Sequence, residues 1–206
     1  FLPVPPCFSP LYSSVASDLY KIQCWCWYEY QCYCLQTIIM YEKTFPNKRF
    51  KKTMEFLEKH VSDTESILDL GVVNPFTKIM QERGYSIENT QGEDLDTDTS
   101  TIENSDANIV TAFEIFEHLL SPFTVLKSIK SNRLVASIPL KLWFSSAYRS
   151  KTDILDRHYH EFEDWQFDWL LEKAGWKIID REKWTNPTKK IGIRPILRWF
   201  TPRYYI

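Results

Sequence analysis

The chain has 206 residues and a formal net charge of −2, from 25 basic and 27 acidic side chains. This length suits one domain with a substantial core, and the lack of a basic excess argues against a nucleic-acid partner. No apolar run approaches the ~20 residues of a membrane-spanning helix, so a membrane partner is not expected either.

All cysteines lie within the first 34 residues, at Cys7, Cys24, Cys26, Cys32 and Cys34. The two Cys-x-Cys pairs allow a zinc or disulfide interpretation, but this region has no histidine and no helical or strand periodicity. A signal peptide fits poorly, because no basic start precedes an apolar core. We therefore expect residues 1–39 to be a non-native or disordered extension. The folded domain is expected at residues 40–206, with no metal site.

The first predicted helix covers residues 47–61, where Phe50, Met54, Leu57 and Val61 recur at helical spacing.

The most informative run is ILDLG at residues 67–71, an apolar segment that ends in an acid and a glycine. It predicts a buried parallel strand that turns directly into a helix over residues 75–83. Asn74 is suited to cap that helix, Pro75 to its first position, and Gly84 to its end. A second strand is expected immediately afterwards, over residues 85–90.

An acidic stretch follows the second strand. Only about 16 residues separate Thr90 from the next predicted strand at Ala107. Because a crossover between parallel strands needs a dozen residues or more, a complete helix and third strand do not fit there. We expect this unit to be shortened or lost.

The rest of the chain continues the alternation of strands and helices. The predicted elements are a strand at 107–113, a helix opened by Ser121 and Pro122 with Phe123, Leu126 and Ile129 inward, a strand at 133–139, a helix at 161–174 with Phe162, Trp165, Trp169 and Leu170 inward, and a strand at 176–184.

Three segments together resemble a known family. They are ILDLG, the run FEIFEHL at residues 113–119, and a strand that ends in Ile138 and Pro139. They resemble the class I S-adenosylmethionine-dependent methyltransferases of the compact bacterial kind, over residues 40–206. The resemblance implies an α/β fold: a Rossmann-like three-layer sandwich around a mostly parallel sheet. The family ends in an antiparallel strand, and a C-terminal truncation inside that strand is expected here.

The resemblance also implies S-adenosylmethionine as cofactor, bound at the carboxyl ends of the strands. The positions that match are Asp69, Gly71, Val72, Asn74, Phe113, Glu114 and His118. The family's ribose-binding acid at the end of the second strand is missing, and Glu93 or Asp94 is expected to replace it. Four of these residues have a structural alternative. Asp69 can cap the next helix, His118 can be a locally satisfied histidine, and Glu93 and Asp94 can belong to a solvated turn.

The segment from Tyr148 to Glu161 is the expected substrate and catalytic region, with Tyr148, His158 and His160 as catalytic candidates. A neutral histidine there can take a proton from a hydroxyl or an amine. His158 and His160 point to opposite sides of an extended chain, so only one is expected to face the site. The alternative is a polar lead-in that caps the helix at Glu161.

The leading hypothesis is a cytoplasmic methyltransferase acting on a small-molecule or glycan-like substrate. Members of the family usually carry Asp/Glu-x-Gly-x-Gly-x-Gly, whereas here Gly71 is followed by Val72, Val73 and Asn74. The missing glycines and the missing second-strand acid motivate a second hypothesis, a non-catalytic binding or scaffold protein with the same fold. A nicotinamide dehydrogenase is less compatible, because the Gly-x-Gly-x-x-Gly pattern is absent. The sequence leaves the oligomeric state open.

Overall fold

The computed structural model describes residues 47–151, 156–188 and 190–206. The chain divides into two units, Phe1–Phe45 and Pro46–Ile206, and every described residue belongs to the second. The predicted extension at residues 1–39, with all five cysteines, lies outside the described residues.

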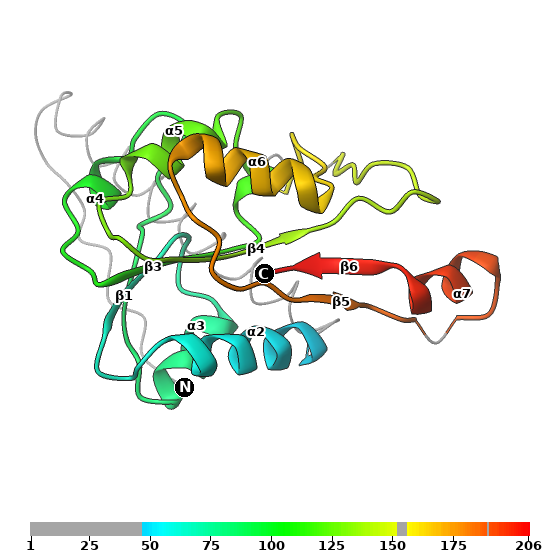
Figure 1. Cartoon of the computed structure of the whole chain (residues 1–206), viewed down its shortest axis with the longest axis horizontal. Coiled ribbons are helices and arrows are strands. Elements are labelled where there is room, and N and C mark those ends of the chain that lie inside the picture. Colours follow the sequence, from blue (N-terminus) through cyan, green and yellow to red (C-terminus); the bar gives the residue numbers. More distant parts are fainter. Residues whose placement is uncertain (1–46, 152–155, 189) are drawn as a thin grey trace, which may run out of the picture. The chain divides into compact units, whose positions relative to one another are not determined.

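A six-stranded, mostly parallel sheet forms the centre of the second unit (Figure 1). Its strands are β1 (Ser66–Asp69), β2 (Ser86–Asn89), β3 (Ile109–Phe113), β4 (Leu134–Pro139), β5 (Lys183–Thr185) and β6 (Pro202–Tyr205). Their order is β2-β1-β3-β4-β6-β5. The first four strands are parallel, and β6 is antiparallel to both β4 and β5. The predicted parallel α/β sheet with a final antiparallel strand is confirmed.

Helices cover both faces of this sheet. They are α2 (Asn47–His60), α3 (Pro75–Glu82), α4 (Ser100–Glu103), α5 (Pro122–Ser128), α6 (Asp164–Ala174) and α7 (Ile193–Phe200), with a 3-10 turn, η1, at Phe116–His118. Figure 1 shows α2 and α3 on one face and α4, α5 and α6 on the other. The arrangement is the predicted three-layer Rossmann-like sandwich. None of the helices in the described ranges has the length and apolarity needed to cross a membrane.

The unit between β2 and β3 is shortened, as expected. It contains the four-residue helix α4 and, among the described residues, no strand, so β2 lies at the edge of the sheet. A hollow of about 420 Å³ lies beside this edge strand. It is lined by Leu68, Glu88, Asn89, Gln91, Thr101, Asn104 and Ser105.

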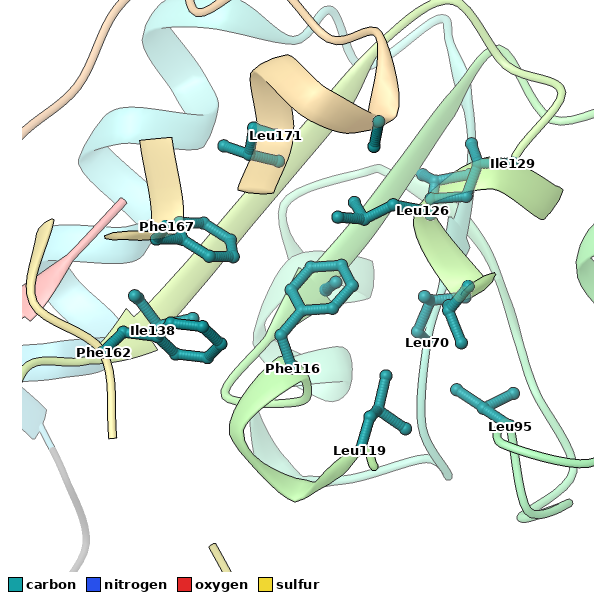
Figure 2. Packing of buried hydrophobic residues seen from close by; sticks show 14 of the residues in the cluster. Leu70, Leu95, Phe116, Leu119, Leu126, Ile129, Ile138, Phe162, Phe167 and Leu171 are labelled. Atoms are coloured by element: carbon teal, nitrogen blue, oxygen red, sulfur yellow. The ribbon is translucent and has the colours of Figure 1, made fainter. Parts of the chain in front are cut away.

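The main core lies between the sheet and the helices α5 and α6. Phe116 and Phe167 are fully buried there, with ring centroids 5.7 Å apart, and Phe162 packs on Phe167 at 5.5 Å. Figure 2 shows these rings near Ile138 of β4 and Leu126 of α5. Phe116 belongs to η1, so the core directly fixes the turn that follows β3.

Two predicted inward faces were partly wrong. In α5, Leu126 and Ile129 are buried as expected, but Phe123 is 40% exposed, and Val125 takes the inward position. Val125 and Leu126 continue the apolar face that ends at Ile129, whereas Phe123 lies on the other side of this short helix.

In α6 the helix begins at Asp164, three residues later than predicted, and Trp165 and Trp169 are 43% and 64% exposed. The buried face is instead Phe167, Leu171 and Ala174. The two tryptophans lie four residues apart on the outer surface and pack edge-to-face on each other, at 4.8 Å. Their size marked them as core residues, but the helical register places them outside.

The C-terminal region also differs from the prediction. The strand predicted at residues 176–184 is a strand only at its end, where β5 covers Lys183–Thr185. Before β5, the side chain of Asp180 contacts Lys59 and His60 of α2. This part of the chain therefore packs against a helix and is not a strand. Residues 193–200 form α7, which buries none of its residues and was not expected as a helix.

Candidate functional site

Asp69, the last residue of β1, lies inside the protein, with 2% of its surface exposed. Its Oδ1 accepts a hydrogen bond from the Thr111 hydroxyl at 2.7 Å. Its Oδ2 accepts from Asn89 Nδ2 at 3.1 Å and from the Thr77 hydroxyl at 3.4 Å. Burial raises the pKa of Asp69 to about 6, although these hydrogen bonds act in the opposite direction. The carboxylate thus joins three strand ends to α3, and its role in cofactor binding stays a prediction.

Gly71 forms the turn after β1 and has a positive φ of 116°, a conformation that favours glycine. Its amide donates to the Thr90 hydroxyl at 2.7 Å, and its carbonyl accepts from Asn89 Nδ2 at 3.0 Å. Residues from the end of β2 therefore hold the turn after β1. Asn89, the last residue of β2, uses its side-chain amide inside the fold.

Asn74 acts as the predicted cap of α3. Its Oδ1 accepts from the amides of Phe76 at 2.8 Å and Thr77 at 3.2 Å, and the Thr77 hydroxyl accepts from the Asn74 amide. The cap of α3 is thus Asn74 and not Asp69. Val72 and Val73 lie between Gly71 and this cap and are 41% and 56% exposed. The two valines therefore lie on the accessible side of the turn after β1.

The loop after β2 comes close to the loop after β1. Gly92 has a positive φ of 91°, and a Cβ there would lie 3.1 Å from Val72 Cγ1. Gly84 has a similar φ of 94° but has no atom within 4 Å of its added Cβ. Gly92 and Gly84 thus have similar backbone conformations, but only Gly92 lies against a neighbouring loop.

We expect Gly92→Ala to destabilise the protein more than Gly84→Ala. Each change places alanine at positive φ, at about 1–2 kcal/mol, and only Gly92→Ala adds the contact with Val72. Urea unfolding of both variants measures the difference. Adding Val72→Ala to Gly92→Ala should remove the excess, and equal destabilisation of the two single variants would contradict the close approach of the loops.

The structure distinguishes the two acids expected to bind a ribose. One carboxylate oxygen of Glu93 accepts from the Gln91 amide at 2.6 Å, while the other, Oε1, is buried and has no hydrogen-bond partner among the described residues. Asp94 is exposed and accepts from the Asp96 amide within its own turn. Asp96 in turn accepts from the Leu120 and Ser121 amides, before α5. Glu93 is therefore the acid with a free, desolvated acceptor beside the strand ends.

The end of β3 is tied to α2 through Glu114. Its Oε2 lies 3.2 Å from Arg49 Nη1, and its Oε1 accepts from the Ser137 hydroxyl at 3.0 Å. Glu114 has a φ of 59°, the one positive φ of a non-glycine in the described ranges. Such a conformation is uncommon outside glycine and often marks a functional position. Phe113, the residue before it, packs edge-to-face on Phe76 of α3 at 5.3 Å.

The turn η1 brings two distant parts of the chain together. The carbonyl of Glu117 accepts from the amides of Tyr159 at 2.8 Å and His160 at 3.2 Å. This docks the segment around residue 158 onto the turn after β3, and the rings of His118 and His158 meet at 4.8 Å. His118 was predicted in the cofactor site and His158 in the catalytic region, and the structure joins the two.

The ionisable groups of this turn have perturbed pKa values. Burial raises the pKa of Glu117 well above its usual range, and the neighbouring charge of Glu114 raises it further. Burial, with a smaller effect from His118, lowers the pKa of His158 to about 4. His158 is therefore neutral at physiological pH and has a lone pair available. Strongly perturbed groups of this kind concentrate at functional sites.

A hollow of about 470 Å³ opens beside His158. We call it the substrate hollow, and it is lined by Tyr148, Arg149, Ser150, Lys151, Arg157, His158 and Tyr159. The Tyr148 ring lies 4.5 Å from that of His158, and its hydroxyl donates to Asp156. His160 lies elsewhere: it stacks on Phe162, and its Nε2 is 3.3 Å from the Leu120 carbonyl. Of the two histidines only His158 lines the hollow.

The expected cap of α6 at Glu161 was wrong. Glu163 forms the cap, with Gln166 bonding back to it, and the Glu161 carboxylate accepts from the Tyr148 amide instead. Glu161 thus helps to position the segment that lines the hollow.

Sequence reasoning missed Glu117, Arg49 and Asn89. The first had a signal, an acid directly before His118 within an otherwise apolar run. The other two had none, because their roles depend on partners 65 and 20 residues away.

Comparisons with known proteins concern the fold alone. No family model and no curated protein matches the chain in sequence. In backbone structure it is similar to a provisionally assigned methyltransferase of Bacillus halodurans, at 14% identity and a TM-score of 0.44, over 66% of this chain and 72% of that one. It is also similar to the N-terminal domain of EvdMO1 with SAH bound, at 16% identity, TM-score 0.42, over 61% and 70%. The cyclase SpnF is similar at 17% identity, TM-score 0.43, over 65% and 59%.

Proposed function

We propose that this chain is an S-adenosylmethionine-dependent methyltransferase acting on a small-molecule or glycan-like substrate. The observation that carries the proposal is Oε1 of Glu93, which is buried and has no hydrogen-bond partner in the part of the chain that the structure describes. Glu93 lies one residue from Gly92, where the loop after β2 meets the loop after β1. Ligands of open α/β sheets bind at such carboxyl ends of parallel strands.

The residues present fit the cofactor. A desolvated carboxylate oxygen on Glu93 is suited to accept hydrogen bonds from a ribose diol. The turn at Gly71 lies at the same strand ends, and its amide and carbonyl are held by Thr90 and Asn89. Phe113 and Glu114 lie at the neighbouring strand end, where Glu114 is fixed by Arg49 and Ser137.

When bound, the cofactor supplies an electrophilic methyl group on a sulfonium. Residues at the strand ends and around the substrate hollow would hold this methyl group in line with the substrate's nucleophilic atom and exclude water. His158 is neutral and lines the substrate hollow, so it accepts the proton that the nucleophile releases. Tyr148 contacts the His158 ring and positions it.

The charge of the substrate hollow narrows the substrate class. Arg149, Lys151 and Arg157 contribute three cations to its lining. We infer that the substrate carries an anionic group, such as a carboxylate or phosphate, beside the atom that is methylated.

Titration calorimetry of S-adenosylmethionine into the full chain tests the cofactor. We expect Glu93→Gln to weaken binding by about tenfold to hundredfold, because a hydrogen bond to a charged group contributes roughly 1.5–3 kcal/mol. Asp94→Asn is the matched control, since it changes the adjacent exposed acid and retains the acceptor for the Asp96 amide. Absence of binding to the wild type at millimolar cofactor would refute the proposal.

The second candidate is a non-catalytic binding or scaffold protein with the same fold. It is favoured by the exposed side chains of Val72 and Val73, which follow Gly71 where the resemblance leads us to expect further glycines. It predicts binding of S-adenosylmethionine without transfer to any acceptor in a panel of small anionic metabolites and glycans. Accumulation of S-adenosylhomocysteine with any acceptor in the panel would exclude it.

A further inference from the structure

We propose that Glu117, His118 and His158 form a binding site for a divalent transition-metal ion, at the edge of the substrate hollow. Each residue offers one ligand atom, and the three atoms lie within 4.8 Å of one another. His118 Nε2 is 3.7 Å from Glu117 Oε1. Two imidazoles and one carboxylate are a common protein ligand set for zinc and for non-haem iron.

The carboxylate of Glu117 provides an independent indication of a missing partner. Its side chain is 1% exposed, and its Oε2 has no hydrogen-bond partner within the described ranges. Burying a carboxylate oxygen without a donor lowers the stability of the fold, so such oxygens are normally paired with a hydrogen-bond donor, a positive charge or an ion. The nearest group that can carry a positive charge is the imidazole of His118. A metal ion between these side chains would supply the charge that the carboxylate lacks.

The orientation of His118 is that of a metal ligand. Its Nδ1 lies 3.1 Å from the carbonyl oxygen of Arg157. Because a carbonyl only accepts, Nδ1 must donate, and in the neutral ring Nε2 then carries the lone pair. That lone pair is on the atom facing Glu117. Metal-binding histidines commonly donate their other N–H to a backbone carbonyl or a carboxylate in this way.

The three ligand atoms are slightly farther apart than a bound ion requires. Ligands about 2.1 Å from a tetrahedral ion are roughly 3.4 Å apart, so the side chains must approach by about 1 Å on binding. His118 and His158 are only partly buried, so close packing does not fix their rings on every side. The backbone bonds from Tyr159 and His160 to Glu117 already hold the two segments together.

Three protein ligands leave a coordination position open on a tetrahedral ion. His158 also lines the substrate hollow, so this position is accessible to an oxygen atom of a molecule bound there. While the ion is bound, the lone pair of His158 coordinates it, so His158 accepts a proton from the substrate in the metal-free protein only. Metal binding itself is independent of the cofactor, whereas its use in orienting the substrate rests on the proposed methyltransferase function. The two claims therefore fail separately.

The test is an optical titration of the full chain with Co²⁺, in the absence of S-adenosylmethionine. Free thiols are ligands for such ions, and the chain has five cysteines within its first 34 residues, so the thiols are first blocked with iodoacetamide. We expect one equivalent of Co²⁺ to bind with visible absorption bands, and Zn²⁺ to displace it. His118→Ala and His158→Ala should each weaken binding by at least about tenfold, because each removes one of three ligands.

His160→Asn is the matched control, since His160 lies in the same segment but outside the cluster, and it should bind Co²⁺ like the wild type. Zn²⁺ should also raise the melting temperature of the wild type and of His160→Asn, but not that of the other two variants. Glu117→Gln, if it folds, should behave like the histidine variants. Absence of Co²⁺ binding by the thiol-blocked wild type, or equal binding by all histidine variants, would overturn the proposal.

Discussion

Replacing Phe116 with alanine is expected to lower the free energy of unfolding by about 3–5 kcal/mol, as is typical for a large aromatic residue deleted from a core. Phe116 is fully buried, and its ring packs on Phe167 with 5.7 Å between centroids. Figure 2 shows it surrounded by apolar side chains from several elements, so little relaxation can fill the cavity. Urea unfolding followed by circular dichroism measures the effect.

Phe123→Ala is the control for this prediction. It removes the same side chain from α5, but Phe123 is 40% exposed and should contribute under about 1 kcal/mol. The loss at Phe116 also concerns function, because this residue fixes η1, which carries Glu117 and His118. A Phe116→Ala variant as stable as Phe123→Ala would show that the core is not centred on this turn.

Asp69→Ala is expected to destabilise the fold by about 3 kcal/mol at neutral pH, because it leaves buried donors without an acceptor. The affected groups are the hydroxyls of Thr111 and Thr77 and the amide of Asn89. Asp106→Ala is the control, since Asp106 is exposed and precedes β3. Unchanged stability of Asp69→Ala would mean that the carboxylate does not hold the strand ends together.

The effect of Asp69 should depend on pH in a defined direction. The pKa of Asp69 is raised to about 6 in the folded protein from 3.8, so between these values the folded state keeps a proton that the unfolded state has lost. The stabilisation from this proton is complete below the unfolded pKa and is lost as pH rises through 6. The stability gap between wild type and Asp69→Ala should therefore widen by about 1 kcal/mol from pH 7 to pH 5.

Direct titration checks the same point. The carboxyl carbon signal of Asp69 in the nuclear magnetic resonance spectrum should titrate with a midpoint near 6. A midpoint at the ordinary value, with a stability gap that does not change with pH, would show that its hydrogen bonds outweigh burial.

The sequence by itself determined the succession of strands and helices from α2 to α6 and the position of the strand ends in that part of the chain. The ILDLG run, followed by Asn74 and Pro75, defined β1, its turn and its capped helix, because apolar runs and caps act over a few neighbouring residues. The count of residues after Thr90 was enough to exclude a complete third strand, since chain length limits what can fit.

Local pattern was less informative where a helix is short or its apolar face is mixed. Trp165 and Trp169 looked like core residues by size, but the register that buries Phe167 and Leu171 turns them outward. The opposite case is α7, where Ile193, Ile196, Leu197 and Phe200 recur at helical spacing but no residue of the helix is buried.

Only the tertiary structure decided which polar groups meet. Asp69 was predicted at a strand end, but its three donors come from β2, β3 and α3, which no local pattern connects to it. His118 and His158 are 40 residues apart, and they meet because the Glu117 carbonyl accepts from the chain just beyond His158. Periodicity says which face of an element a side chain lies on. Which residue it meets on that face depends on the packing between elements. The proposed cofactor, substrate and metal sites all consist of residues that only this packing brings together.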